Sequence, residues 1–146
     1  MRKRASFYKG NKFYIIHSSS KVINGFNIAT EPYFKLDITS PLSDVVRKLL
    51  EAMRASKEGL PNPTNWNEFQ KEYLKNIGLR SHKDLYKGYI FCDIFEENEK
   101  ILITPTVNKG IDGGFSYLPD KTVQISSNKS IDEICDALKK AIDACE

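Results

Sequence analysis

The sequence predicts a single α+β domain in which about three to four helices pack against a mostly antiparallel sheet. Its 146 residues, 40% apolar and 28% charged, have the composition of one globular domain long enough to bury a core. Strand-like segments come first, helical stripes follow, and strands and one last helix close the chain. This order favours segregated strands and helices over repeating βαβ units.

Residues 5–38 are typical of antiparallel strands, because short aromatic and β-branched runs alternate with turn residues. Residues 9–12, Lys-Gly-Asn-Lys, predict a first hairpin turn. Asn24-Gly25 predicts a type I′ turn, since both residues tolerate positive φ. Residues 33–38 predict an edge strand, because the preceding Pro32 cannot donate a ladder hydrogen bond.

Three helices are expected in the middle of the chain. Ser40 and Pro41 predict an N-cap and a first helical residue, and Gly59 a terminator. The apolar stripe of this helix recurs at helical spacing, as Leu42, Val45, Val46, Leu49, Leu50 and Met53. A second helix runs from a cap at Asn65 or Thr64 to Gly78, and its face of Trp66, Phe69, Tyr73 and Ile77 indicates core packing. Ser81 predicts the cap of a short third helix ending at Lys87.

The last third predicts strands over 88–97, 101–107 and 122–125 and a helix from Ser130 to Cys145. The charged residues 96–100 form the turn between the first two strands. The loop 109–117 holds three of the chain's eight glycines, which indicates unusual backbone dihedrals or a close approach. Ser130 and Glu133 are spaced as a capping box at the start of the last helix.

The net positive charge of the chain lies at its N-terminus. Three of the 22 basic residues lie in positions 1–4, so the rest of the chain balances its 19 acidic residues. We therefore expect residues 1–4 to form a flexible basic tail on a domain spanning 1–146, and the neutral body is poor evidence for direct nucleic-acid binding. No apolar run approaches the ~18 residues of a membrane span. The three cysteines, Cys92, Cys135 and Cys145, form no pattern, which indicates a reduced cytoplasmic protein.

No catalytic or metal motif stands out. The glycine loop is not a phosphate cradle, since Lys109 precedes Gly110 and a strand follows where a helix is required. His17 and His82 would allow an acid–base pair, but the sequence does not bring them together. The acidic run ending at Lys100 lacks the acidic residue two positions before the lysine that a metal-dependent nuclease core requires, since Asn98 stands there. We expect no catalytic residue, no metal ligand and no cofactor.

Several stretches resemble a family of bacterial contact-dependent growth inhibition immunity proteins over nearly the whole chain. The stretches are residues 6–16, Thr-Glu-Pro-Tyr-Phe (30–34), Pro-Asn-Pro-Thr-Asn-Trp (61–66) and Gly-Gly-Phe-Ser-Tyr-Leu-Pro (113–119). The resemblance implies a cytoplasmic protein that binds the C-terminal toxin domain delivered by a neighbouring cell. It implies that such a toxin is often a nuclease, and that inhibition is non-covalent occlusion without chemistry.

The contact surface is a hypothesis from the residues. We expect the glycine loop and the acidic hairpin to present it, through Lys109, Asp112, Phe115, Tyr117, Glu96, Glu97 and Glu99. An acidic patch would complement a basic nuclease cleft, and the last helix offers a second one. Two other classes remain open: a small nuclease or other hydrolase using His17 and His82, and a general cytoplasmic interaction module. Membrane and small-molecule partners are not expected.

Overall fold

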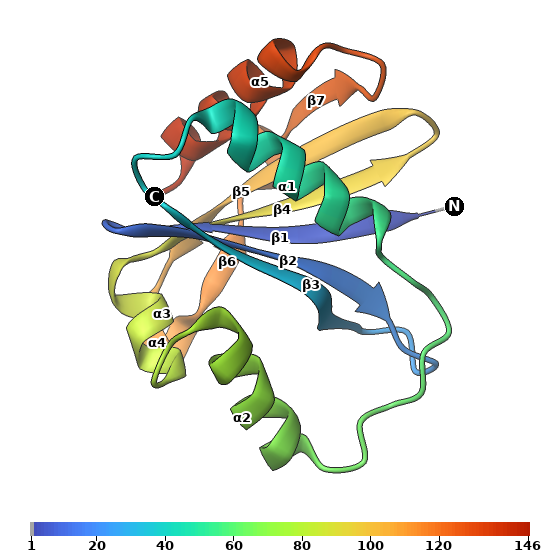
Figure 1. Cartoon of the computed structure of the whole chain (residues 1–146), viewed down its shortest axis with the longest axis vertical. Coiled ribbons are helices and arrows are strands. Elements are labelled where there is room, and N and C mark those ends of the chain that lie inside the picture. Colours follow the sequence, from blue (N-terminus) through green and yellow to red (C-terminus); the bar gives the residue numbers. More distant parts are fainter. Residues whose placement is uncertain (1) are drawn as a thin grey trace.

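The computed structural model describes residues 2–146, which build one seven-stranded sheet with helices on both faces (Figure 1). The strands are β1 (Lys3–Lys9), β2 (Phe13–Lys21), β3 (Asn27–Asp37), β4 (Ile90–Glu97), β5 (Lys100–Asn108), β6 (Phe115–Tyr117) and β7 (Val123–Ser126). The helices are α1 (Leu42–Arg54), α2 (Trp66–Ile77), α3 (His82–Gly88), α4 (Gly110–Gly113) and α5 (Ile131–Ala144), with a 3₁₀ turn η1 (Pro119–Lys121). The α+β class is confirmed, and the one helix beyond the expected number is the single turn α4.

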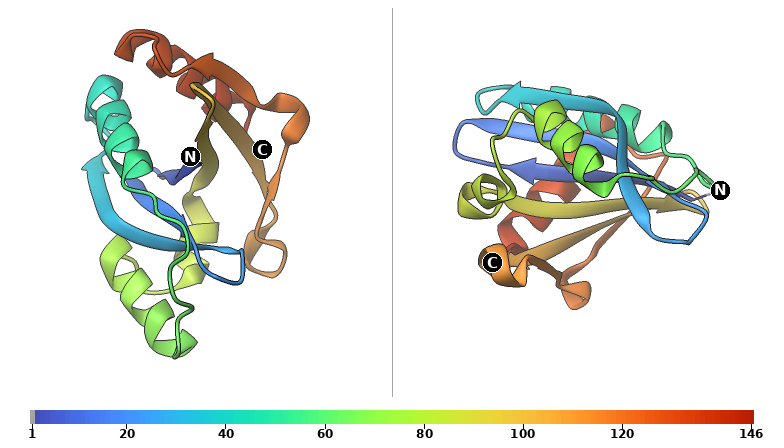
Figure 2. Two further views of the ribbon diagram at one scale, coloured as in Figure 1. Left: turned by 90° about the vertical axis from the view of Figure 1, so that its right-hand side faces the viewer. Right: turned by 90° about the horizontal axis from the view of Figure 1, so that it is seen from below.

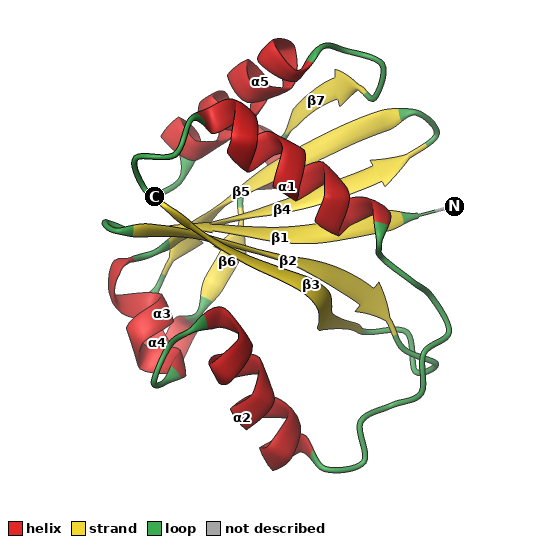
Figure 3. Ribbon diagram, in the orientation of Figure 1, coloured by secondary structure: helices red, strands yellow, loops and turns green. Residues whose placement is uncertain are grey.

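The strand order is β3-β2-β1-β4-β5, with β6 and β7 both paired to β5 (Figure 3). All pairs between these strands are antiparallel. β3 is the edge strand that Pro32 predicted. His17 lies opposite Tyr33 and Ser18 opposite Thr30, so Glu31 and Pro32 bulge out of the ladder, where a residue without an N–H costs no hydrogen bond.

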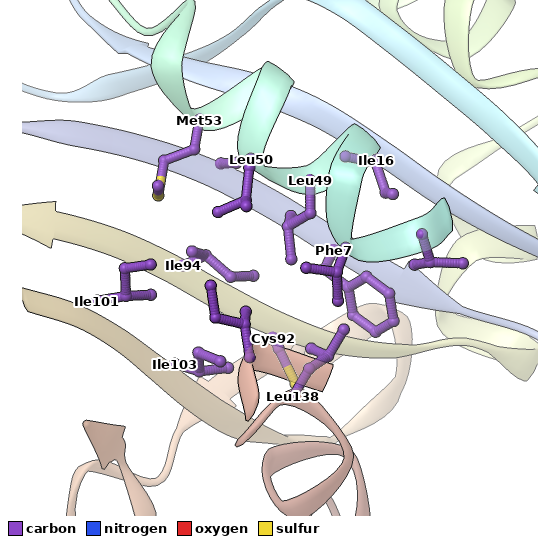
Figure 4. Close-up of a cluster of buried hydrophobic side chains, with 14 of the residues drawn as sticks. Phe7, Ile16, Leu49, Leu50, Met53, Cys92, Ile94, Ile101, Ile103 and Leu138 are labelled. Carbon is purple, nitrogen blue, oxygen red and sulfur yellow. The ribbon is translucent and has the colours of Figure 1, made fainter. Parts of the chain in front are cut away.

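Successive residues of the central strands point to opposite faces of the sheet. On β1, Phe7 enters a core cluster with α1 and α5, whereas Tyr8 enters a second cluster with α2 and α3. Figure 2 shows α1 and α5 on one side of the sheet and α2 on the other. In Figure 4, Phe7, Leu49 and Leu138 meet in the first cluster. The expected stripe of α1 and the apolar residues Ile134, Leu138 and Ala141 of α5 both face this cluster.

The expected basic tail is wrong in its second half. Lys3 and Arg4 begin β1, where they lie opposite Glu96 and Phe95 of β4. Arg4 is half-buried, and its Nη1 lies 3.0 Å from Asp93 Oδ2. Arg2 Nε lies 3.3 Å from Glu97 Oε1, and Met1 is outside the described residues. These basic residues are ordered because β4 pairs with β1 along its length and supplies Asp93 and Glu97 as acidic partners.

Three turn and cap predictions are also corrected. At 22–26 only Gly25 has a positive φ, of 93°, and the Gly25 N–H donates to Val22 O, so the turn is type I closed by a left-handed glycine rather than type I′. The residue before α1 is Pro41, not Ser40, and no side chain caps this helix. The helix ends at Arg54, and Gly59 lies in the following turn. The caps at Asn65, Ser81 and Ser130 are confirmed.

Two of the three cysteines lie close together in the fold. Cys92 Sγ on β4 lies 3.6 Å from Cys145 Sγ at the end of α5, and all three cysteines are free thiols. The chain end is held at the same place, because the Glu146 N–H donates to Thr106 O and the Asn108 N–H donates to Glu146 O. The sequence could not show this contact, since it joins residues 53 positions apart.

Candidate functional site

A pocket of about 470 Å³ opens on the sheet face opposite α1 and α5. Its floor comes from the β1, β2 and β4 residues that point away from the main core. Its sides come from α2, α3, β6 and the β2–β3 hairpin. Strand periodicity therefore produces the floor, and two separate helices and a short strand complete it.

The floor is polar. Ser6 of β1 lies between His17 of β2 and Asp93 of β4 in the ladder, and Arg4 lies opposite Ser19 one pleat further along. All five residues line the pocket. Buried polar groups of this kind are costly unless they are paired, so their partners decide what the floor can do.

The walls are aromatic. Trp66, Phe69 and Tyr73 contribute from α2, and Phe115 and Tyr117 from β6. The rings touch one another around the opening: Trp66 lies 5.5 Å from Phe69, and Phe115 lies 5.5 Å from Phe91 on the floor, between ring centroids. The expectation that the α2 aromatics belong to the core is wrong for Trp66, which is 43% exposed, because a pocket lies beneath it where a closed core would bury it.

Arg4 and Asp93 neutralise each other on the floor. Besides its 3.0 Å ion pair, the Arg4 guanidinium lies 4.8 Å from the centroid of the Phe95 ring. Burial raises the pKa of Asp93, and the adjacent guanidinium opposes this shift. The pair leaves Asp93 committed to Arg4 rather than free to act as a base.

His17 is 3% exposed, and its two ring nitrogens differ. Nδ1 lies 2.8 Å from Ser18 O, and because a carbonyl only accepts, Nδ1 carries the proton. Nε2 has no hydrogen-bond partner among the described residues. Burial lowers the pKa of His17 to about 4, so the ring is neutral near pH 7 and Nε2 is a bare acceptor.

The two histidines do come to the same pocket, which the sequence could not show. The Tyr73 ring lies between them, 5.6 Å from His17 and 5.9 Å from His82 between centroids. A ribonuclease-type pair needs an imidazole base with a pKa near neutral pH, and burial lowers the pKa of His17 to about 4, which makes it a weak base there. A Ser-His-Asp relay also fails, because Asp93 binds Arg4 and His17 Nδ1 binds Ser18 O.

The residues expected at the contact surface are divided between two places. Phe115 and Tyr117 line the pocket, and Lys109 and Asp112 lie beside them at α4. Glu96, Glu97 and Glu99 lie at the β4–β5 turn, five or more β5 residues away from the partners of Phe115 and Tyr117, so roughly 20 Å separates the two groups along the strand. The glycine loop and the acidic hairpin therefore do not form one compact surface.

The glycine loop has a structural explanation. Asn108 Nδ2 donates to Tyr86 O and Tyr89 O, and its Oδ1 accepts from the Gly110 N–H. Gly110 and Gly114 have φ of 82° and 66°, which other residues rarely adopt. These contacts turn the chain back from β5 so that β6 can place Phe115 and Tyr117 at the pocket.

Two features are absent from the part of the chain that the structure describes. Residues 2–146 contain no group of three or more His, Cys, Asp or Glu side chains placed to hold a metal ion. Among the same residues, no helix is long and apolar enough to span a membrane.

Comparison with known proteins identifies the family. A family model described as CDI immunity protein matches residues 3–145. A protein of unknown function from Neisseria meningitidis has a similar structure, with a TM-score of 0.81, 17% identity, and 100% of this chain and 96% of that chain covered. A chain of a CdiA-CT/CdiI toxin and immunity complex from Yersinia pseudotuberculosis has a TM-score of 0.78 and 16% identity, with 100% and 98% covered. A search of curated proteins gives no match. The two structures establish the shared fold, and the match over 3–145 shows that this chain belongs to the CDI immunity protein family.

Proposed function

We propose that this protein neutralises a cognate CDI toxin domain by non-covalent binding, with a segment of the toxin seated in the aromatic pocket. The family supports the class of partner, and the Yersinia pseudotuberculosis neighbour comes from a toxin and immunity complex. The protein acts in the cytoplasm without chemistry of its own, and the toxin is a nuclease, as the resemblance of the sequence implies.

The observation that carries the binding site is the set of exposed aromatic rings around a concave opening. Trp66 and Phe26 are 43% exposed and Tyr117 is 55% exposed, although large apolar side chains are usually buried. Exposed aromatic residues beside a pocket are the side chains that dominate protein interfaces, because each buries a large area at a small cost in side-chain entropy. The Phe26 and Trp66 rings are 5.6 Å apart, so they form one side of the opening together.

The glycine loop serves this site by position rather than by charge. It holds Phe115 and Tyr117, and it brings Lys109 and Asp112 to the outside of the same rim. Glu96, Glu97 and Glu99 form a separate acidic patch, partly neutralised where Arg2 binds Glu97. We propose that the pocket supplies most of the binding energy and that the acidic hairpin contributes mainly to long-range attraction.

The test uses the toxin domain encoded directly upstream. It measures the affinity of the toxin for this protein and the protection of cells that express both. Trp66→Ala and Tyr117→Ala should each weaken the complex by about 30-fold or more, as expected for an interface hot spot, with little change in stability. Ile23→Ala is the matched control, since Ile23 is exposed and does not line the pocket. Cleavage of DNA and tRNA by the toxin, with and without each variant, measures inhibition directly.

The outcome separates the two surfaces. If Trp66→Ala and Tyr117→Ala bind as tightly as the wild type, the pocket is not the interface. If the triple reversal of Glu96, Glu97 and Glu99 to Lys abolishes equilibrium binding while the pocket variants retain it, the hairpin is the interface instead.

A further inference from the structure

We propose that His17 is a specificity-determining residue of this pocket. It selects a toxin segment whose tip carries a neutral hydrogen-bond donor, either a hydroxyl or an amide N–H. This inference rests on the proposed function. It goes further by naming the chemistry that the floor of the pocket recognises.

The acceptor is fixed by the backbone beside it. Ser18 O, 2.8 Å from Nδ1, can only accept, so the Nδ1 proton points at the backbone and the Nε2 lone pair is left for a donor from outside. Nε2 is completely buried and without a partner in residues 2–146. A buried acceptor in that condition is a standing cost that a correctly placed donor removes.

The surrounding rings hold the imidazole in place. Tyr8, Tyr33 and Tyr73 lie 6.0, 5.5 and 5.6 Å from His17 between ring centroids, on three different elements. The hydrogen bond to Ser18 O and these three contacts leave little freedom to rotate the ring. Because Nε2 is buried, a partner's donor reaches it only when a neighbouring ring on the pocket side moves aside, and the fixed imidazole then determines where that donor must lie.

Charged side chains are disfavoured at this acceptor. A carboxylate would place its lone pairs against the lone pair of Nε2. A lysine would lose its hydration among the tyrosine rings, and the carboxylate on the floor, Asp93, is already paired with Arg4. A neutral donor on a short or aromatic side chain meets neither penalty. Serine, threonine, tyrosine, asparagine and glutamine are the side chains of this class.

Selectivity follows from what happens when the donor is absent. A site with a buried hydrogen-bonding group rejects a partner that lacks the complement more strongly than an apolar site rejects a wrong shape. A toxin variant with an apolar tip would bury Nε2 still unpaired. A related toxin of the same shape but without the donor is discriminated against at this one atom.

The experiment is a double-mutant cycle between His17 and the toxin. On this side the variant is His17→Phe, which keeps an aromatic ring but removes Nε2, and His82→Phe is the matched control at the other pocket histidine. On the toxin side, the side-chain donors of its interface are replaced one at a time by apolar isosteres, such as Ser→Ala, Thr→Val and Tyr→Phe. Dissociation constants are measured by calorimetry for every pair.

We expect one donor replacement in the toxin to weaken binding by about 10- to 100-fold against the wild type and by less than about threefold against His17→Phe. The same replacement should keep its full effect against His82→Phe. Uncoupled effects for every donor would overturn the role of His17 while leaving immunity intact. A wild-type protein that binds no toxin at all would instead overturn the proposed function.

A second measurement on the wild type is independent of how well the variant folds. The ¹⁵N resonance of His17 Nε2 should be that of an unprotonated nitrogen in the free protein. It should move upfield on addition of the toxin, as an acceptor nitrogen does when it is hydrogen-bonded. A resonance that toxin binding leaves unchanged would contradict the inference.

Discussion

The two faces of the sheet differ in polarity, although they are built from alternate residues of the same strands. Toward α1 and α5 the strands present Phe7, Ile16, Cys92 and Ile94, all at most 1% exposed and in contact with helical stripes. Toward α2 they present Ser6, His17 and Asp93, on the floor of an open pocket. The contrast indicates that stability comes mainly from the first face and leaves the second free to carry a costly polar surface.

The difference extends to the helices. α5 buries Ile134, Ala137, Leu138 and Ala141. In α2 only Ile77 is buried, and Trp66, Phe69 and Tyr73 line the pocket. A helix that covers a pocket gains less from burial than one that closes a core, because part of its apolar surface remains in water. The next three predictions test this comparison, beginning with the largest effect.

Leu138→Ala should lower the free energy of unfolding by about 2–5 kcal/mol, because it leaves a cavity under α5 where Leu138 is fully buried. Phe69→Ala on α2 should cost clearly less, since its side chain already borders open space. Urea denaturation of both variants measures the difference. Equal losses would show that the pocket face contributes as much to stability as the core face.

The second prediction concerns acid. The pKa of His17 is about 4 in the folded protein and 6.5 without the fold, so between these values the unfolded chain binds a proton that the folded chain does not. Above about pH 6.5 His17 is neutral in both states, so its titration does not lower the free energy of unfolding. As the pH falls from 6.5 to 4, protonation of His17 in the unfolded chain lowers the free energy of unfolding by about 3 kcal/mol.

Urea denaturation as a function of pH checks this prediction. His17→Phe should show a flatter dependence between pH 6.5 and 4 than the wild type, with His82→Phe as the comparison variant. Because carboxyl groups also titrate near pH 4, the informative quantity is the difference between the wild-type curve and the His17→Phe curve. Parallel curves for wild type and His17→Phe would mean that His17 is not buried as a neutral ring.

The smallest effect compares two helix caps. Asn65 Oδ1 accepts from the Glu68 N–H at the start of α2, and Ser130 Oγ accepts from the Glu133 N–H at the start of α5. Alanine at either position should cost about 1 kcal/mol. We expect Ser130→Ala to lower the stability of the whole sheet, whereas Asn65→Ala speeds amide exchange in α2 alone. Faster exchange throughout the protein in Asn65→Ala would remove the distinction between the faces.

Much of the fold could be predicted because the signals are local. The helical stripes, the caps at Asn65, Ser81 and Ser130, and the strand alternation each depend on residues a few positions apart. A stripe shows which side of a helix is apolar but not what lies opposite it. For this reason the stripe of α2 predicts core along its whole length, which is right for Ile77 and Tyr73 but wrong for Trp66 at the pocket opening.

The site was less accessible for the same physical reason. Arg4 pairs with Asp93, 89 residues away, so three basic residues at the chain start could only be interpreted as a tail. Phe115 and Tyr117, which line the pocket, are singled out in the sequence by the glycines beside them, because a turn is a local signal. His17 was recognised only as an isolated histidine, since the rings around it come from β1, β3 and α2.

The alternation along β1 has a consequence for how such a protein can change. Ala5 and Phe7 point into the core, and Arg4, Ser6 and Tyr8 point to the pocket side, so the two faces of β1 are built from alternate residues. Insertion or deletion of one residue within β1 would exchange the two sets and place Arg4 and Ser6 against α1. In the binding mode proposed above, partner preference can therefore diversify by point substitution at the even-numbered positions of this strand, whereas its length is constrained by the hydrophobic core.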